Sequence, residues 1–101
     1  MRQTDKFLSL LGMARRANRV SLGYEQVLDA VHSGKCYVVF YASDMSEKTV
    51  RGIIFASEEW STKVVSTSYT MQNISDAVGQ KTGIVAVNDA GFGKRLLELL
   101  S

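Results

Sequence analysis

The 101-residue sequence contains no proline, one cysteine and one histidine. Without proline, its turns must be formed by glycine, asparagine and serine. The single Cys36 excludes an intrachain disulfide, and a lone cysteine entering an apolar strand is usually a small buried hydrophobe. His32 alone cannot supply the ligand clusters of a zinc site or a histidine-based triad. We therefore expect no metal, no cofactor and no enzymatic activity.

Long hydrophobic runs are also lacking. No run approaches the roughly 20 residues that a membrane span needs, and the N-terminal segment has no small-residue cleavage site after its short apolar patch. A content of 46% hydrophobic and 22% charged residues is typical of one compact globular domain. We therefore expect a single domain over residues 1–101 that is located in the cytoplasm and has no membrane partner.

Positive charge is concentrated in the first third of the chain. Residues 1–35 hold six basic and three acidic residues, a net charge of +3, whereas the other residues hold six and seven, a net charge of −1. Attraction to phosphate dominates the sequence-independent part of nucleic-acid binding. Arg15, Arg16 and Arg19 therefore indicate RNA as a partner, with no DNA specificity expected. A solvated helix face would give the same charge run, and that interpretation stays open.

Helical and strand-like patterns alternate along the chain. Residues of good capping type, or glycine, open five expected helices: Thr4, Gly23, Ser46, Thr70 and Asp89. The first helix should run to about Ala17 and be broken by Asn18, and the fourth should stop at Gly79 in a left-handed conformation. Short strands are predicted over residues 20–22, 37–42, 63–67 and 84–87.

Apolar residues at helical spacing predict which helix faces are buried. In the second helix the stripe consists of Tyr24, Val27, Leu28 and Val31, which leaves Glu25, Asp29 and His32 in solvent. In the third helix it consists of Val50, Ile53, Ile54 and Ser57. These stripes must pack on the strands that lie between the helices.

The strand pattern predicts the fold class. The continuous apolar run 37–42 indicates a central strand covered on both faces. Strands separated by helices of about three turns favour parallel pairing, which needs a crossover of a dozen residues or more. We therefore predict an α/β fold, a three-layer α/β/α sandwich with a mixed, largely parallel sheet of about four strands.

Two patterns are weak candidates for chemistry. Glu25 and Asp29 lie one helical turn apart, where they fit either an acid/base or cation-binding pair or two solvated carboxylates near a helix N-terminus. Residues 89–94 follow a strand and open a helix, so they fit either a phosphate site of a nucleotide-using enzyme or a plain helix cap. The plain interpretations are favoured in both cases.

Several short motifs occur in one order along the chain: Leu11 to Ala17 (LGMARRA), Gly23-Tyr24-Glu25, Ser33-Gly34-Lys35, Ala42-Ser43-Asp44 and Val87 to Phe92 (VNDAGF). With this ordered set, over about residues 5–100, the chain resembles the YlxQ-type bacterial proteins. These belong to the kink-turn-binding ribosomal protein superfamily, usually labelled with the archaeal ribosomal protein L-seven-Ae.

The resemblance implies a non-catalytic RNA-binding protein of ribosomal type. Such proteins bind a kink-turn, a bent duplex with tandem sheared G·A pairs. The N-terminal end of their second helix enters the widened groove, and the loop before the last strand covers an extruded nucleotide. The implied partner is ribosomal or other structured RNA, with the ribosome itself as a candidate. Together with the basic segment, the expected RNA-binding residues are Arg15, Arg16, Arg19, Gly23, Glu25, Gln26, Gly79, Gln80 and Lys81.

The helix opening differs from that of typical kink-turn readers in this superfamily. They show Gly-x-Asn-Glu-x-x-Lys, where this chain has Gly23, Glu25, Gln26 and Asp29. Asp29 replaces a cation with an anion, which repels phosphate. The alternative hypothesis is a protein-interaction module that kept the fold but lost kink-turn recognition, with candidate contact residues Trp60, Tyr69 and Met71; core packing of these three is also expected.

Overall fold

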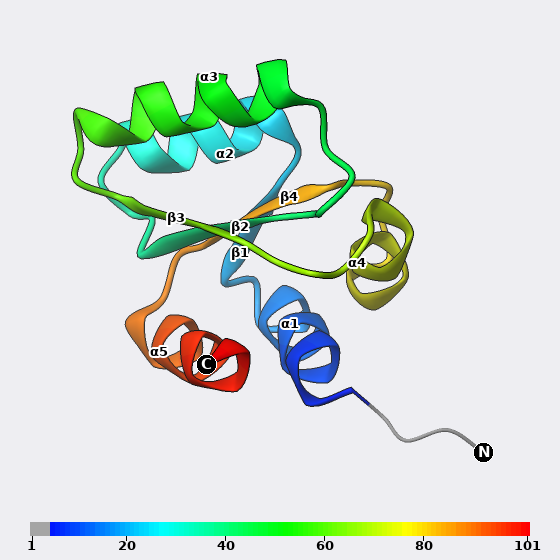
Figure 1. Ribbon diagram of the computed structural model, residues 1–101. Coiled ribbons are helices and arrows are strands. Elements are labelled where there is room, and N and C mark those ends of the chain that lie inside the picture. The colour runs from blue at the N-terminus through cyan, green and yellow to red at the C-terminus, as the bar shows by residue number, and fades with distance from the viewer. Residues whose placement is uncertain (1–4) are drawn as a thin grey trace.

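A four-stranded mixed sheet divides the protein into three layers (Figure 1). The computed structural model describes residues 5–101. The strand order is β1–β4–β2–β3, with bounds β1 Val20–Leu22, β2 Val38–Tyr41, β3 Lys63–Ser66 and β4 Ile84–Val87. One face carries α2 (Tyr24–His32) and α3 (Glu47–Glu58), and the other carries α1 (Lys6–Arg16), α4 (Met71–Val78) and α5 (Ala90–Leu100). The predicted α/β/α sandwich is confirmed.

The expectation of largely parallel pairing is wrong in detail. Only β2 and β3 are parallel, whereas β4 runs antiparallel to both of its neighbours, β1 and β2. The eight-residue α4 is about 12 Å long. It lies at the end of the sheet where β3 leaves, beside α1, so the chain enters β4 from that same end (Figure 1). α4 therefore does not carry the chain back to the end of the sheet where β3 begins, and β4 runs antiparallel to β2.

Local capping explains where most helices begin. Asp5 accepts a hydrogen bond from Leu8 N at 3.0 Å and caps α1, whereas the expected cap, Thr4, lies outside the described residues. The predicted caps Ser46, Thr70 and Asp89 are confirmed by side-chain bonds to the third helical amide. α1 ends at Arg16, and Asn18, which was predicted to break the helix, follows with a positive φ. α4 stops at Gly79 in the left-handed conformation, as predicted.

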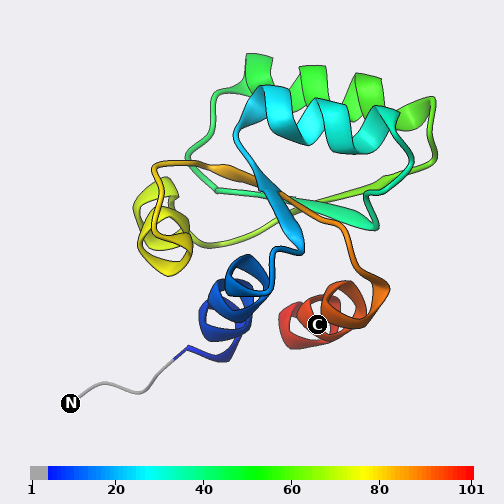
Figure 2. The ribbon, with the colours of Figure 1, turned by 180° about the vertical axis from the view of Figure 1, so that it is seen from behind.

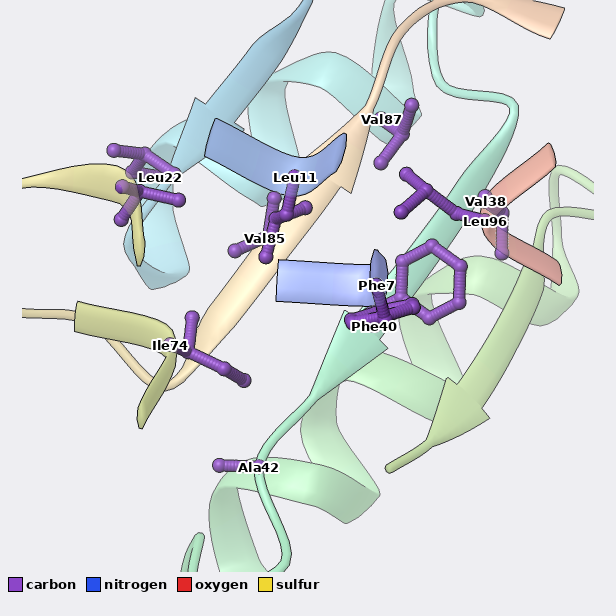
Figure 3. Packing of buried hydrophobic residues seen from close by; sticks show 11 residues of the cluster. Phe7, Leu11, Leu22, Val38, Phe40, Ala42, Ile74, Val85, Val87 and Leu96 are labelled. Atoms are coloured by element: carbon purple, nitrogen blue, oxygen red, sulfur yellow. The ribbon is translucent and has the colours of Figure 1, made fainter. Parts of the chain in front are cut away.

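The larger core lies between the sheet and α1, α4 and α5 (Figures 2 and 3). Phe7 of α1 packs edge-on against Phe40 of β2, with ring centroids 5.2 Å apart and planes at 85°. Alternate residues of each strand point to this side, and the others point to α2 and α3. This is why the central strands read as continuous apolar runs, and Val38, Val39 and Phe40 are all fully buried.

Two residues of the predicted helix stripes are exposed, as is Tyr37, which precedes β2 and was predicted to lie in the covered central strand. Tyr24 is 38% exposed and Ile54 is 39% exposed. Tyr24 is the first residue of α2, and its phenol lies against Gly52 of α3 instead of under the sheet. In α3 the buried positions are Ile53 and Ser57, and Ile54 is rotated by about 100° from Ile53 around the helix axis. The buried face of α3 is therefore narrower than the apolar stripe that the sequence predicted.

Candidate nucleic-acid interface

Two segments that are far apart in the sequence are joined at the N-terminal end of α2. Gly23 N donates to Thr82 Oγ1 at 3.2 Å and also to Ile84 O at 3.4 Å. The Thr82 hydroxyl accepts from Ile84 N at 3.2 Å and donates to Ile84 O at 2.8 Å. Thr82 is 5% exposed. One buried hydroxyl thus holds the loop 79–83 against the opening of α2.

The other side of this loop is tied to α4. Ser75 Oγ accepts from Thr82 N at 2.9 Å and donates to Thr82 O at 3.0 Å. Gln80 and Lys81, which precede Thr82, are exposed. Thr82 lies in the loop that the resemblance implied but was not among the residues predicted individually, and Ser75 was not predicted at all. Thr82 and Gly23 are 59 positions apart, so no local spacing could have linked them.

The opening of α2 is the only helix start in residues 5–101 without a side-chain cap. Gly23 stands at the N-cap with φ 88° and ψ 154°, a conformation that is essentially restricted to glycine. The first helical amides, those of Tyr24, Glu25 and Gln26, have no intrahelical acceptor. Uncapped amides at a helix N-terminus, together with the helix dipole, favour a bound anion such as phosphate.

A basic side chain reaches the same region from α1. Arg15 Nε donates to Val78 O at 3.3 Å, so the guanidinium lies at the C-terminal end of α4, next to Gly79. Lys81 adds a second cation in the exposed loop. Within residues 5–101 the only ion pair joins Arg51 and Glu47, so no direct carboxylate contact neutralises these two cations.

The structure therefore gathers most of the predicted residues but separates others. The gathered set is Arg15, Gly23, Glu25, Gln26, Gly79, Gln80 and Lys81. Arg16 lines a groove between α1 and α4, together with Asp5 and Asp76. Arg19 lies at the other end of β1, where Asn88 N donates to its carbonyl oxygen. At about 3.3 Å per strand residue, Arg19 is roughly 13 Å from Gly23.

The two other candidate sites, residues 89–94 and the pair Glu25 and Asp29, have plain structural interpretations. Asp89 Oδ2 accepts from Phe92 N at 2.8 Å, which is the plain helix cap, and its carboxylate occupies the position where a phosphate would bind. Glu25 and Asp29 are both solvent-exposed, and residues 5–101 contain no group of three metal-ligating side chains. In that same range, no helix is both long enough and apolar enough to cross a membrane.

The other singled-out residues divide between core and surface. Tyr69 stacks on Phe7, with ring centroids 5.1 Å apart, and its hydroxyl donates to Asp5, so it is a packing residue. Met71 is partly buried against the larger core, whereas Trp60 is 47% exposed. Burial raises the pKa of the Cys36 thiol to about 11, which agrees with an inert, partly buried cysteine.

The mixed sheet, covered by helices on both faces, defines an α/β sandwich protein over residues 5–101. The chain belongs to the ribosomal protein L7Ae/L30e/S12e/Gadd45 family, whose model matches residues 5–96. The resemblance inferred from the sequence is thereby confirmed. Over 96 residues the chain is 26% identical to the RNA-binding protein YlxQ of Enterococcus faecium, in a match that covers 95% of this chain and 92% of that protein.

Solved structures share the same fold. A protein of unknown function from Bacillus halodurans C superposes with a TM-score of 0.89 at 32% identity, and the match covers 96% of this chain and 98% of that one. The 15.5 kD RNA-binding protein of Giardia lamblia superposes with a TM-score of 0.77 at 17% identity, covering 97% and 88% of the two chains. At that level of identity, the second likeness supports the fold alone.

Proposed function

We propose that this protein is a non-catalytic RNA-binding protein of ribosomal type that recognises structured, kink-turn-like RNA. The RNA would be bound by the opening of α2 and by the loop 79–83. The observation that carries the proposal is the hydrogen bond between Gly23 and Thr82, because it fixes an uncapped helix N-terminus and an exposed basic loop in one relative position. Membership of the family and the likeness to the YlxQ protein support the same conclusion.

Each part of the site has a distinct role in this proposal. The amides of residues 24–26 receive a phosphate, and Arg15 and Lys81 bind the backbone on either side. The Gln26 side chain carries both donor and acceptor groups for base edges, whereas the exposed Glu25 carboxylate at the same helix opening weakens the attraction of the phosphate. Arg16 extends the footprint along α1. Arg19 contributes only if the RNA continues along β1.

The proposed target is ribosomal RNA or another structured RNA, with the cytoplasm as the site of action and the ribosome as a candidate partner. Titration with a labelled kink-turn RNA, and with a straight duplex of matched length and composition, tests the proposal. We expect the kink-turn to bind more tightly and its affinity to fall steeply with salt, because phosphate contacts release counterions. Equal binding of the two RNAs, or binding of neither, would contradict kink-turn recognition.

Charge substitutions test where the RNA lies. Lys81→Ala should weaken binding and reduce the slope of log affinity against log salt by about 1, the change expected for one lost phosphate contact. Lys94→Ala is the matched control, since Lys94 is also an exposed lysine and lies on α5. Asp29→Lys should strengthen binding and steepen the slope. If Lys81→Ala and Lys94→Ala behave alike, the loop does not contact RNA.

A further inference from the structure

A groove on α2 and α3 combines aromatic rings with cations. Its lining consists of Tyr24, Lys48, Thr49, Arg51, Gly52 and Phe55. The two helices lie side by side above the sheet in Figure 1, on the face opposite α1 and α5. No carboxylate lines the groove, although Glu47 of the same helix lies 3.8 Å from Arg51. We call it the Tyr24–Phe55 groove.

Phe55 has no role in the packing of α3. Its side chain is 74% exposed, more than any other large hydrophobic residue in the described part of the chain. The helix packs instead through Ile53 and Ser57, which are buried. A single exposed apolar residue is ordinary on a protein surface. Phe55 is informative because a second aromatic ring and two cations line the same groove.

Gly52 makes room for the second ring. A Cβ atom built on Gly52 would lie 2.5 Å from the Tyr24 hydroxyl oxygen, so the phenol rests against the backbone of α3 at this residue. Glycine in a helix interior is less stable than alanine. A larger residue at position 52 would displace the Tyr24 side chain. Glycine therefore allows the Tyr24 ring to line the groove together with Phe55.

We propose that the Tyr24–Phe55 groove binds single-stranded RNA that continues from the structured RNA at the opening of α2. This inference rests on the proposed RNA-binding function. Tyr24 directly follows Gly23, so the groove is continuous with that site. Unpaired bases stack on exposed aromatic rings, while lysine and arginine bind the phosphates between them. The cations in the lining favour RNA over an apolar protein segment.

The test compares three kinds of RNA: a blunt kink-turn, the same kink-turn with a single-stranded oligouridine tail at either end, and free oligouridine. The tail should raise the affinity of the wild-type protein. Phe55→Ala should lower the affinity for tailed RNA and for oligouridine by about tenfold, the size of one lost stacking contact, and leave the blunt RNA unchanged. Phe55→Trp, which keeps a stacking face, should restore binding.

Trp60→Ala is the matched control. Trp60 is also an exposed aromatic residue, at 47% exposure, but it follows the C-terminal end of α3 and is not part of the groove. Its removal should not change the affinity for any of the three RNAs. Because Phe55 and Trp60 are both exposed, neither substitution is expected to unfold the protein.

The outcomes separate this inference from the proposed function. Loss of kink-turn preference, with oligouridine binding still dependent on Phe55, would refute the kink-turn proposal and retain the groove. Normal binding of the blunt kink-turn, with no effect of the tail or of Phe55→Ala, would overturn the groove. Capture of a protein that survives nuclease treatment and requires Phe55, with RNA affinities unchanged, would assign the groove to a protein partner and also overturn the inference.

Discussion

Replacing Thr82 with valine should release the loop 79–83 from the opening of α2. Valine keeps the shape of the side chain but exchanges the hydroxyl for a methyl group. Three backbone groups then lose a partner: Ile84 N, Ile84 O and Gly23 N. Gly23 N keeps its longer bond to Ile84 O, at 3.4 Å, whereas Ile84 N loses the acceptor provided by the hydroxyl.

The expected cost follows from burial. Thr82 is 5% exposed, so water does not replace the hydroxyl. A buried polar group left unpaired costs about 1–3 kcal/mol. With one amide fully unpaired and one partly compensated, we expect the free energy of unfolding to fall by about 2 kcal/mol. In a chain of this size that loss lowers the midpoint of thermal unfolding by about 10 °C.

Urea and thermal unfolding followed by circular dichroism measure this loss, and amide hydrogen exchange at Ile84 and Gly23 locates it. Thr82→Ser keeps the hydroxyl and loses one methyl group, at a cost of about 1 kcal/mol, and should preserve slow exchange at Gly23. Thr62→Val is a matched control, because the partly buried Thr62 directly precedes β3, away from Gly23 and Ile84. Wild-type stability and exchange in Thr82→Val would refute the assigned role of Thr82.

Three further predictions concern packing and titration. Gly12→Ala places a Cβ 2.9 Å from Ala77 O, and overpacking against the α4 backbone, less the gain in helix propensity, should lower stability by about 1 kcal/mol in urea unfolding. Burial and the Asp5 carboxylate raise the pKa of Tyr69 from 10.0 to about 12, so stability that is present below pH 10 should be lost as the pH rises to 12. Tyr69→Phe should lack that loss, and an equal loss in the variant would contradict the assignment. Burial raises the pKa of Cys36 to about 11, so its thiol should react slowly with a thiol reagent at pH 8 when folded and rapidly in urea, and equal rates would contradict its burial.

Local signals in the sequence were sufficient to predict the elements and most of their ends. The caps at Ser46, Thr70 and Asp89 each bond an amide three residues ahead, so the whole interaction lies within one short stretch of sequence. Gly79 ends α4 through its own left-handed conformation. Such features depend on neighbours along the chain, which is why they can be predicted without knowledge of the fold.

Strand direction and helix orientation depend on contacts that are distant in sequence. Whether β4 runs parallel or antiparallel is decided by where α4 packs against α1, and Gly12 permits that close approach. The exposure of Tyr24 is decided similarly by Gly52, which lies 28 positions further along the chain. Periodicity predicted an apolar face for each helix but could not predict which of its residues would meet a partner.

Gly23 shows how a distant contact changes the meaning of a local motif. In the sequence Gly23 is a residue that opens a helix, and a Cβ atom built there meets nothing within 4 Å, so no crowding requires glycine at this position. Glycine is required instead by the positive φ of 88°, and its own amide is occupied by Thr82. A phosphate bound at this helix opening would therefore be held by the amides of Tyr24, Glu25 and Gln26. Since Glu25 is an exposed acidic residue in the first turn of α2, its carboxylate opposes the phosphate that the backbone attracts, and neutralising it with Glu25→Gln should increase RNA affinity in a titration. Unchanged or weaker binding of Glu25→Gln would contradict a phosphate bound at this opening.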